Sequence, residues 1–99
     1  MRVIKRKTVV EFYTNHPDFK SHLESWYAEV KKADWQNPQE LLADFPKASA
    51  IKDNRIVFRK GNDYRIIIQI NYSKQIAYIC FIGTHSEYEN VDAETVWSY

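Results

Sequence analysis

Ninety-nine residues are enough for one domain and too few for two, so we treat residues 1–99 as a single domain. Hydrophobic residues make up 44% and aromatic residues 15% of the chain, which is typical of a packed globule and excludes a disordered or low-complexity protein. The one cysteine, Cys80, excludes an internal disulfide, and its place in an apolar run predicts a buried thiol.

Membrane insertion and secretion have no support in the sequence. No run approaches the ~18 apolar residues that a membrane-spanning helix needs. The N-terminal stretch MRVIKRKTVVEF is basic but is not followed by the apolar segment of a signal peptide. We therefore expect a cytoplasmic protein without membrane contact.

The net charge of +1 conceals an uneven distribution. Residues 75–99 carry four acidic side chains and no Lys or Arg. Residues 47–74 carry only two acidic side chains and seven basic ones, namely Lys47, Lys52, Arg55, Arg59, Lys60, Arg65 and Lys74. A basic stretch of this kind is typical of a surface that binds a polyanion, and it is equally compatible with the solvated faces of strands.

The first half of the chain is predicted to be helical after a short edge strand over residues 1–4. Helices are expected over residues 7–13 and 19–32, separated by Pro17, which disfavours helix at the preceding residue. A third helix follows in NPQELLADFP, where Asn37 is a good N-cap, Pro38 suits the first turn and Glu40 completes a capping box.

The second half is predicted to form strands. The segments SAIK, RIVFRK, DYRIIIQINY and IAYICFIGT are rich in β-branched and aromatic residues, and tight polar turns separate them. In residues 64–72, one set of alternate positions is entirely apolar and the other, which includes Arg65, is mixed. The sequence thus predicts an α+β fold with N-terminal helices on one face of a small antiparallel sheet. The mixed face should be at least partly open, and residues 90–97 should form a short C-terminal helix.

Two classes of site are excluded by residue type and spacing. The histidines at positions 16, 22 and 85 are too scattered for a zinc site and have no second cysteine to help them. The chain also lacks a glycine-rich phosphate-binding loop.

A cluster at one end of the predicted sheet is the main candidate for chemistry. His85 and Tyr88 follow the last strand inside a predicted capping box from Thr84 to Glu87. They should meet Arg65 on the neighbouring strand. We expect phosphate contacts from further polar residues near the Gly61-Asn62 turn, namely Arg55, Arg59, Lys60 and Asn62.

These residue types suit metal-independent RNA cleavage. Guanidinium groups hold phosphate oxygens, imidazole serves as acid or base near neutral pH, and a phenol stacks on a base or relays a proton. The structural alternatives remain open: His85 as a hydrogen-bonding residue at a helix N-terminus, Tyr88 as a packing residue, and Arg65 as an ion-pair partner of Asp63 or Glu87.

The segments around these residues resemble the HigB family, which belongs to the RelE/ParE group of bacterial toxins. Gly61, Asn62, Tyr64 and Arg65 match one block of the family pattern. A second block, Thr-His-x-Glu-Tyr, matches residues 84–88, and WQNPQELLADFP is similar to the family's third helix. The chain departs from the pattern at Glu89, where Asp is expected, and at residues 57–60, where an expected Asn is absent.

The resemblance implies a RelE-like fold and an endoribonuclease that cuts mRNA in the ribosomal A site without a cofactor. In this role Arg65, with Arg59 or Lys60, would hold the scissile phosphate. His85 would act as acid or base, and Tyr88 would position the nucleotide or relay a proton. The implied partners are translated mRNA and a helix-turn-helix antitoxin, through which the toxin would meet operator DNA only indirectly. The alternatives are a ParE-like gyrase poison and a non-catalytic RNA-binding module.

Overall fold

The computed structural model describes residues 1–60 and 63–98 and contains a sheet with helices packed against it. Among these residues, no helix is both long enough and apolar enough to cross a lipid bilayer. In chain order the elements are β1 (Arg2–Ile4), α1 (Arg6–Asn15), the 3-10 helix η1 (Pro17–Phe19), α2 (Lys20–Lys32), α3 (Pro38–Asp44), β2 (Ser49–Ile51), the 3-10 helix η2 (Lys52–Asn54), β3 (Arg55–Lys60), β4 (Tyr64–Asn71), β5 (Ile76–Thr84) and α4 (His85–Glu89).

The sheet has the strand order β1-β5-β4-β3-β2. Strands β2 to β5 form the predicted antiparallel meander. The predicted N-terminal edge strand is also present, and it pairs in parallel with β5 from Arg2 opposite Ile76 to Ile4 opposite Tyr78. The two ends of the sequence are therefore joined in one sheet.

The third helix begins as predicted, with one difference in its cap. The Asn37 side chain accepts a hydrogen bond from the backbone N–H of Glu40 at 3.0 Å, and Pro38 lies in the first turn. The Glu40 carboxylate accepts from the N–H of Gln36 at 2.8 Å rather than from Asn37. The predicted capping box is thus wrong in one of its two bonds, because the carboxylate reaches one residue further back.

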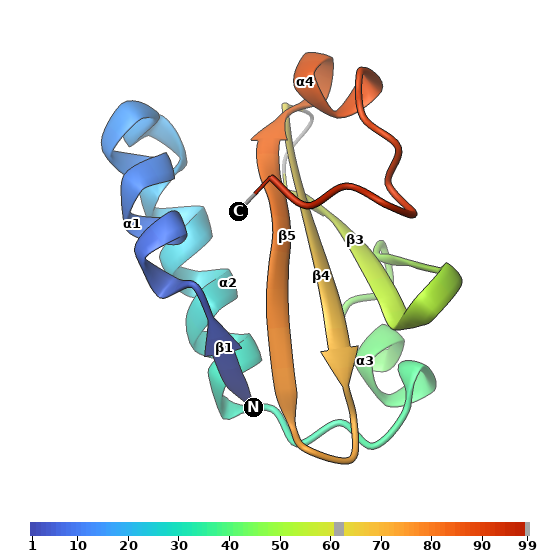
Figure 1. Cartoon of the computed structure of the whole chain (residues 1–99). Helices are drawn as coiled ribbons and strands as arrows, with labels where there is room; N and C mark the ends of the chain where they lie inside the picture. Colours follow the sequence, from blue (N-terminus) through green and yellow to red (C-terminus); the bar gives the residue numbers. More distant parts are fainter. Residues whose placement is uncertain (61–62, 99) are drawn as a thin grey trace.

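Helices α1, α2 and α3 cover one face of the sheet, as expected (Figure 1). Ile66, Ile68 and Ile70 of β4 point into this core and are at most 2% exposed. Trp26 of α2 is fully buried there, 5.4 Å between ring centroids from Phe58 of β3. Burial of each such side chain stabilises the fold by roughly 1.5–3 kcal/mol, so the alternating pattern of β4 fixes which face the helices occupy.

One extra residue interrupts the pairing of β4 with β5. Ile67 lies opposite Phe81 and Ile68 lies opposite Ile79, so Cys80 has no partner in β4. As a result Ile79 and Ile82 both join the helix-covered core, whereas Cys80 and Phe81 lie in a second cluster on the other face. Cys80 is fully buried as predicted, and burial raises the pKa of its thiol.

Residues 91–96 cover part of that second face. Val91, Ala93 and Val96 pack against the cluster, and Ser98 donates its N–H to the carbonyl of Cys80 at 2.9 Å. Figure 1 shows this segment running from α4 back along the sheet. The predicted helix over residues 90–97 is wrong, because the segment forms a turn at Asp92 and docks through individual backbone groups.

Arg55 holds this segment in place. Its guanidinium donates to the carbonyls of Ala93 at 3.1 Å and Val96 at 2.9 Å, and it lies 5.0 Å from the centroid of the Trp97 ring. Arg55 is only 2% exposed. Its burial and the two hydrogen bonds of its Nη1 favour a structural role over the predicted contact with phosphate.

We predict that Arg55→Ala lowers the free energy of unfolding by about 2–4 kcal/mol, because two charge-assisted hydrogen bonds are lost and two carbonyls are left without this donor. Urea denaturation followed by circular dichroism measures the change. Lys52→Ala, at an exposed position of η2, is the matched control and should stay within about 0.5 kcal/mol of wild type. Equal stability of the two variants would contradict the structural role of Arg55.

Candidate active site

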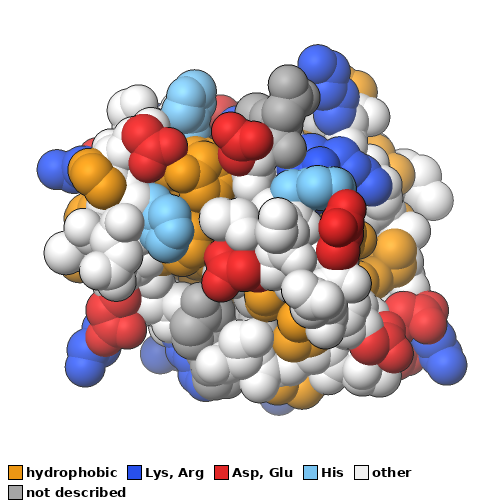
Figure 2. Space-filling view, turned by 90° about the horizontal axis from the view of Figure 1, so that it is seen from above, with side chains coloured by type: hydrophobic (Ala, Val, Ile, Leu, Met, Phe, Trp, Pro, Cys, Tyr) orange, Lys and Arg blue, Asp and Glu red, His pale blue; other side chains and the backbone are white. Residues whose placement is uncertain are grey.

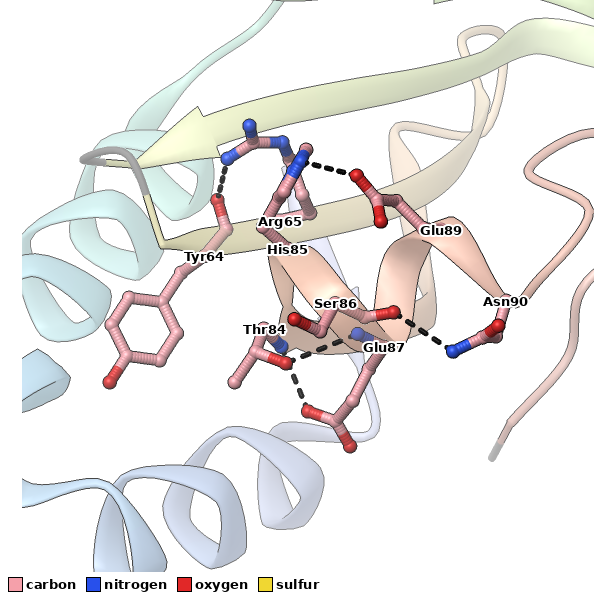
Figure 3. A network of polar contacts seen from close by, with 8 residues as sticks. All are labelled: Tyr64, Arg65, Thr84, His85, Ser86, Glu87, Glu89 and Asn90. Atoms are coloured by element: carbon pink, nitrogen blue, oxygen red, sulfur yellow. Dashed lines mark hydrogen bonds and ion pairs between the residues drawn. The ribbon is translucent and has the colours of Figure 1, made fainter.

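Three residues form a row across the sheet at the end where α4 begins. Arg65 of β4 lies directly opposite Arg59 of β3 on one side and Gly83 of β5 on the other. Directly opposed residues share a face of the sheet, so both guanidinium groups belong to the face that the helices leave uncovered. The Arg65 side chain also donates to the carbonyl of Tyr64 at 2.9 Å (Figure 3).

The predicted capping box fixes the start of α4 beside this row. Thr84 accepts from the N–H of Glu87 at 3.2 Å, and the Glu87 carboxylate accepts from the N–H of Thr84 at 2.9 Å. The N–H of His85 donates to the carbonyl of Asp63 at 2.6 Å, which ties the helix to the residue before β4. These bonds hold His85 near Arg65, because His85 lies two residues after Gly83, which is opposite Arg65 in the sheet.

The His85 ring is exposed and has a defined partner. Its Nε2 atom lies 2.7 Å from a carboxylate oxygen of Glu89, and about half of its side-chain surface is accessible (Figure 3). Figure 2, a view onto this end of the molecule, shows histidine side chains at the surface and a basic group beside one of them. The Glu89 carboxylate thus holds the ring through Nε2.

Tyr88 is anchored by the second apolar cluster. It is half-buried, and its ring centroid lies 6.4 Å from that of Phe81. The Phe81 ring in turn fills the space beside Gly83, where an added Cβ would lie 2.5 Å from the ring. The absence of a side chain at position 83 thus allows Phe81 to support Tyr88.

The expected phosphate contacts divide between the two faces. Arg59 shares the face of Arg65, and its guanidinium donates to Ser49 Oγ at 2.7 Å and to the carbonyl of Lys47 at 3.3 Å. Lys60 points to the helix-covered face, with its ammonium 5.6 Å from the centroid of the Phe45 ring. Asn62 lies outside the described residues. In the described part of the chain, no group of His, Cys, Asp and Glu has a geometry suited to a metal ion.

An aromatic group beside the site was not expected from the sequence. Tyr64, opposite Thr84 in the pairing of β4 with β5, stacks on Phe19 with centroids 4.0 Å apart. His16 stacks on Phe12 at 4.1 Å. The sequence offered one signal for this group. Tyr64 directly precedes Arg65, and alternation along the strand places its side chain on the face opposite that of Arg65.

Asp18 perturbs the hydroxyl of Tyr64. The hydroxyl donates to Asp18 Oδ2 at 2.7 Å, and this bond, together with partial burial, raises the pKa of Tyr64 to about 12. Tyr64 therefore stays protonated throughout the physiological range and acts as a hydrogen-bond donor.

The fold and this site define a class of protein, namely a small α+β domain that presents cationic groups and a histidine at one end of its sheet. The family model HigB_toxin, described as the RelE-like toxic component of a toxin–antitoxin system, matches residues 19–91. The chain belongs to this family, which confirms the resemblance noted in the sequence. Family membership implies an antitoxin partner.

Several relatives match over most of their length. The mRNA interferase toxin HigB of Escherichia coli K12 is 28% identical over 92 residues, which cover 90% of this chain and 88% of the relative. The mRNA interferase HigB of Shigella flexneri matches with the same identity and coverage. That of Escherichia coli O6:H1 is 26% identical over 94 residues, covering 92% of this chain and 91% of the relative.

We predict a pH dependence that belongs to Tyr64. Its pKa is near ~10 in an unfolded chain and about 12 here, so its contribution to stability is present below pH ~10 and is lost as the pH rises toward 12. Absorbance titration of tyrosinate should show a late step that Tyr64→Phe removes and Asp18→Asn shifts to lower pH. Tyr13→Phe removes a different tyrosine and should retain the step. An unshifted step in Asp18→Asn would refute the role of the carboxylate.

Proposed function

We propose that this protein is a ribosome-dependent mRNA interferase, an endoribonuclease that cuts translated mRNA in the ribosomal A site. The row of Arg59 and Arg65 beside the capped helix that begins at His85 carries the proposal. The names of the relatives, which are mRNA interferases, support it independently.

The proposed reaction is attack of a ribose 2′-oxygen on the adjacent phosphorus. The 2′-hydroxyl loses its proton, the 2′-O–P bond forms, and the P–O5′ bond breaks. A 2′,3′-cyclic phosphate remains on one fragment and a protonated 5′-hydroxyl on the other. Arg65 is proposed to hold the phosphate oxygens and to offset the charge that develops on them, in a reaction that uses no metal or organic cofactor.

His85 is the proposed proton-transfer group. With Nε2–H donated to Glu89, the neutral ring carries a lone pair on Nδ1, and the carboxylate stabilises the charged ring after proton uptake. The sequence and the geometry are compatible with either direction of transfer, so His85 is assigned as acid or base. Glu89, at the position where the family pattern has Asp, is proposed to orient the ring.

The remaining site residues are proposed to position the RNA. Tyr88 packs near Phe81 and lies three residues after His85 in α4, and it is proposed to contact a nucleotide or relay a proton. Arg59 is the second phosphate contact on the face of Arg65. Lys60 is proposed to approach the RNA from the other face of β3. Asn62 is proposed as a phosphate contact on the basis of the sequence pattern alone.

The biological setting follows from the same proposal. The toxin acts in the cytoplasm, its antitoxin carries a helix-turn-helix domain, and the pair meets operator DNA through the antitoxin. His85 and Arg59 are exposed, and Arg65 and Tyr88 are half-buried. A site of this kind suits a substrate that the ribosome has already ordered.

We predict that His85→Gln and Arg65→Ala fold normally and lose growth arrest, with RNA cleavage reduced by roughly 10²–10⁴-fold and 10²–10³-fold respectively. Mapping of RNA 5′ ends shortly after induction measures the cleavage. Wild type should produce new ends inside translated codons, in frame with the message. Ser86→Ala and Lys74→Ala, both at exposed positions, are the matched controls and should cut as wild type does.

The same experiment separates the alternatives. Growth arrest without new RNA ends would contradict the proposal and move the assignment to a gyrase poison, which a supercoiling assay tests. Wild-type cleavage by both His85→Gln and Arg65→Ala would contradict the site assignment.

A further inference from the structure

Strand β2 is shorter than the strand it pairs with, and this leaves a hollow. The pairing runs only from Ser49 opposite Val57 to Ile51 opposite Arg55, so residues 58–60 of β3 extend beyond it. A hollow of about 200 Å³ lies beside this end of β3, and we call it the Phe45 hollow. Its lining residues are Asp44, Phe45, Pro46, Lys47, Ala48, Phe58, Arg59 and Lys60.

The Phe45 hollow has an aromatic floor. The rings of Phe45 and Phe58 meet edge to face with centroids 5.0 Å apart, and Phe45 also contacts Trp35 at 5.9 Å. Phe58 is 1% exposed and Phe45 is half-buried, so Phe45 offers the accessible ring. Ala48 and Pro46 complete the apolar surface.

The rim of the Phe45 hollow is cationic. Lys47 and Arg59 are exposed, and the Lys60 ammonium lies 5.6 Å from the centroid of the Phe45 ring. One carboxylate, Asp44, opposes these three positive charges, and it already accepts a hydrogen bond from Trp35 Nε1 at 2.8 Å. The rim therefore favours an anionic ligand.

Size and charge together restrict what the hollow accepts. Its volume is below the ~300–1,000 Å³ of typical small-molecule sites, so it suits a single planar group rather than a whole drug-sized ligand. A nucleotide within RNA combines a flat base, which stacks on aromatic rings, with phosphates on either side, which pair with Lys and Arg.

The hollow shares one residue, Arg59, with the proposed active site. This residue lines the hollow and lies directly opposite Arg65 in the sheet. Figure 1 shows β3 ending at the same end of the sheet as α4. RNA bound at Arg65 would thus pass the hollow with a neighbouring nucleotide.

We propose that the Phe45 hollow binds one nucleotide of the RNA next to the scissile bond. The base lies against Phe45, which the buried ring of Phe58 supports from below, and the adjoining phosphates pair with Lys47, Lys60 and Arg59. This inference rests on the proposed function, because its ligand is the RNA that the active site cuts.

A non-cleavable RNA tests the proposal without requiring cleavage. A fluorescent 2′-O-methyl RNA hexamer is titrated with wild type, with Lys47→Ala/Lys60→Ala, and with Lys52→Ala/Lys74→Ala, which removes the same charge at exposed positions outside the hollow. We expect the first double variant to bind roughly tenfold more weakly or worse. For this variant, the slope of the logarithm of the binding constant against the logarithm of the salt concentration should also become shallower, by the amount expected for the loss of about two phosphate contacts. The control pair should bind as wild type does, and thermal melts confirm that both fold.

A second variant addresses the base. Ala48→Leu narrows the Phe45 hollow without changing charge, so it should weaken hexamer binding and leave the salt slope unchanged. In mapping of RNA ends, it should alter base preference at one position fixed relative to the cut.

The outcomes separate this inference from the proposed function. Equal hexamer binding by both double variants overturns the inference, while His85-dependent cleavage still supports the proposed function. Hexamer binding that requires Lys47 and Lys60, in a protein that cuts no RNA, supports the nucleotide site and refutes the nuclease. Wild-type RNA binding by Lys47→Ala/Lys60→Ala, with loss of inhibition by the antitoxin, overturns the inference and assigns the hollow to the antitoxin.

Discussion

The extra residue at Cys80 is the constraint on which the rest of the site depends. Side chains alternate along a strand, so one added residue reverses the faces of everything that follows in β5. Beyond Cys80, Ile82 points to the helices and Gly83 faces Arg65. The carbonyl of Cys80 also accepts a hydrogen bond from the N–H of Ser98, and this bond docks the C-terminal segment. The bulge thereby sets both the position of α4 and the cover over the second face.

Much of the fold was predictable because local signals and long-range packing agree. Asn37 and Pro38 start α3, Thr84 and Glu87 start α4, and alternating isoleucines define the buried face of β4. The bulge was not predictable, since residues 79–82 are all apolar and fit either face. The helix predicted over residues 90–97 was wrong for a related reason. Their helical pattern was weak, and Arg55 and Cys80, distant in sequence, bind their backbone groups instead.

The candidate site was predictable at the level of its residues and less so in its geometry. The two sequence blocks identified Arg65 and His85, and the register places them near one another. Counting charges could not separate Arg55, Arg59 and Lys60, which share one basic stretch but differ in burial and face. The pairing of β3 with β4 places Arg59 on the face of Arg65 and Lys60 on the other. The burial of Arg55 depends on contacts with residues 38 and 41 positions away.

The pairing of β1 with β5 has a consequence for the order of synthesis. Arg2 leaves the ribosome long before Ile76, beside which it pairs, and Arg55 leaves before the carbonyls of Ala93 and Val96 to which it donates. Because chains emerge from the N-terminus, the sheet gains its first strand only after its fifth has appeared. The C-terminal segment that docks on Arg55 and Cys80 is likewise added late. A nascent toxin remains unfinished for nearly the whole time that its own message is being translated.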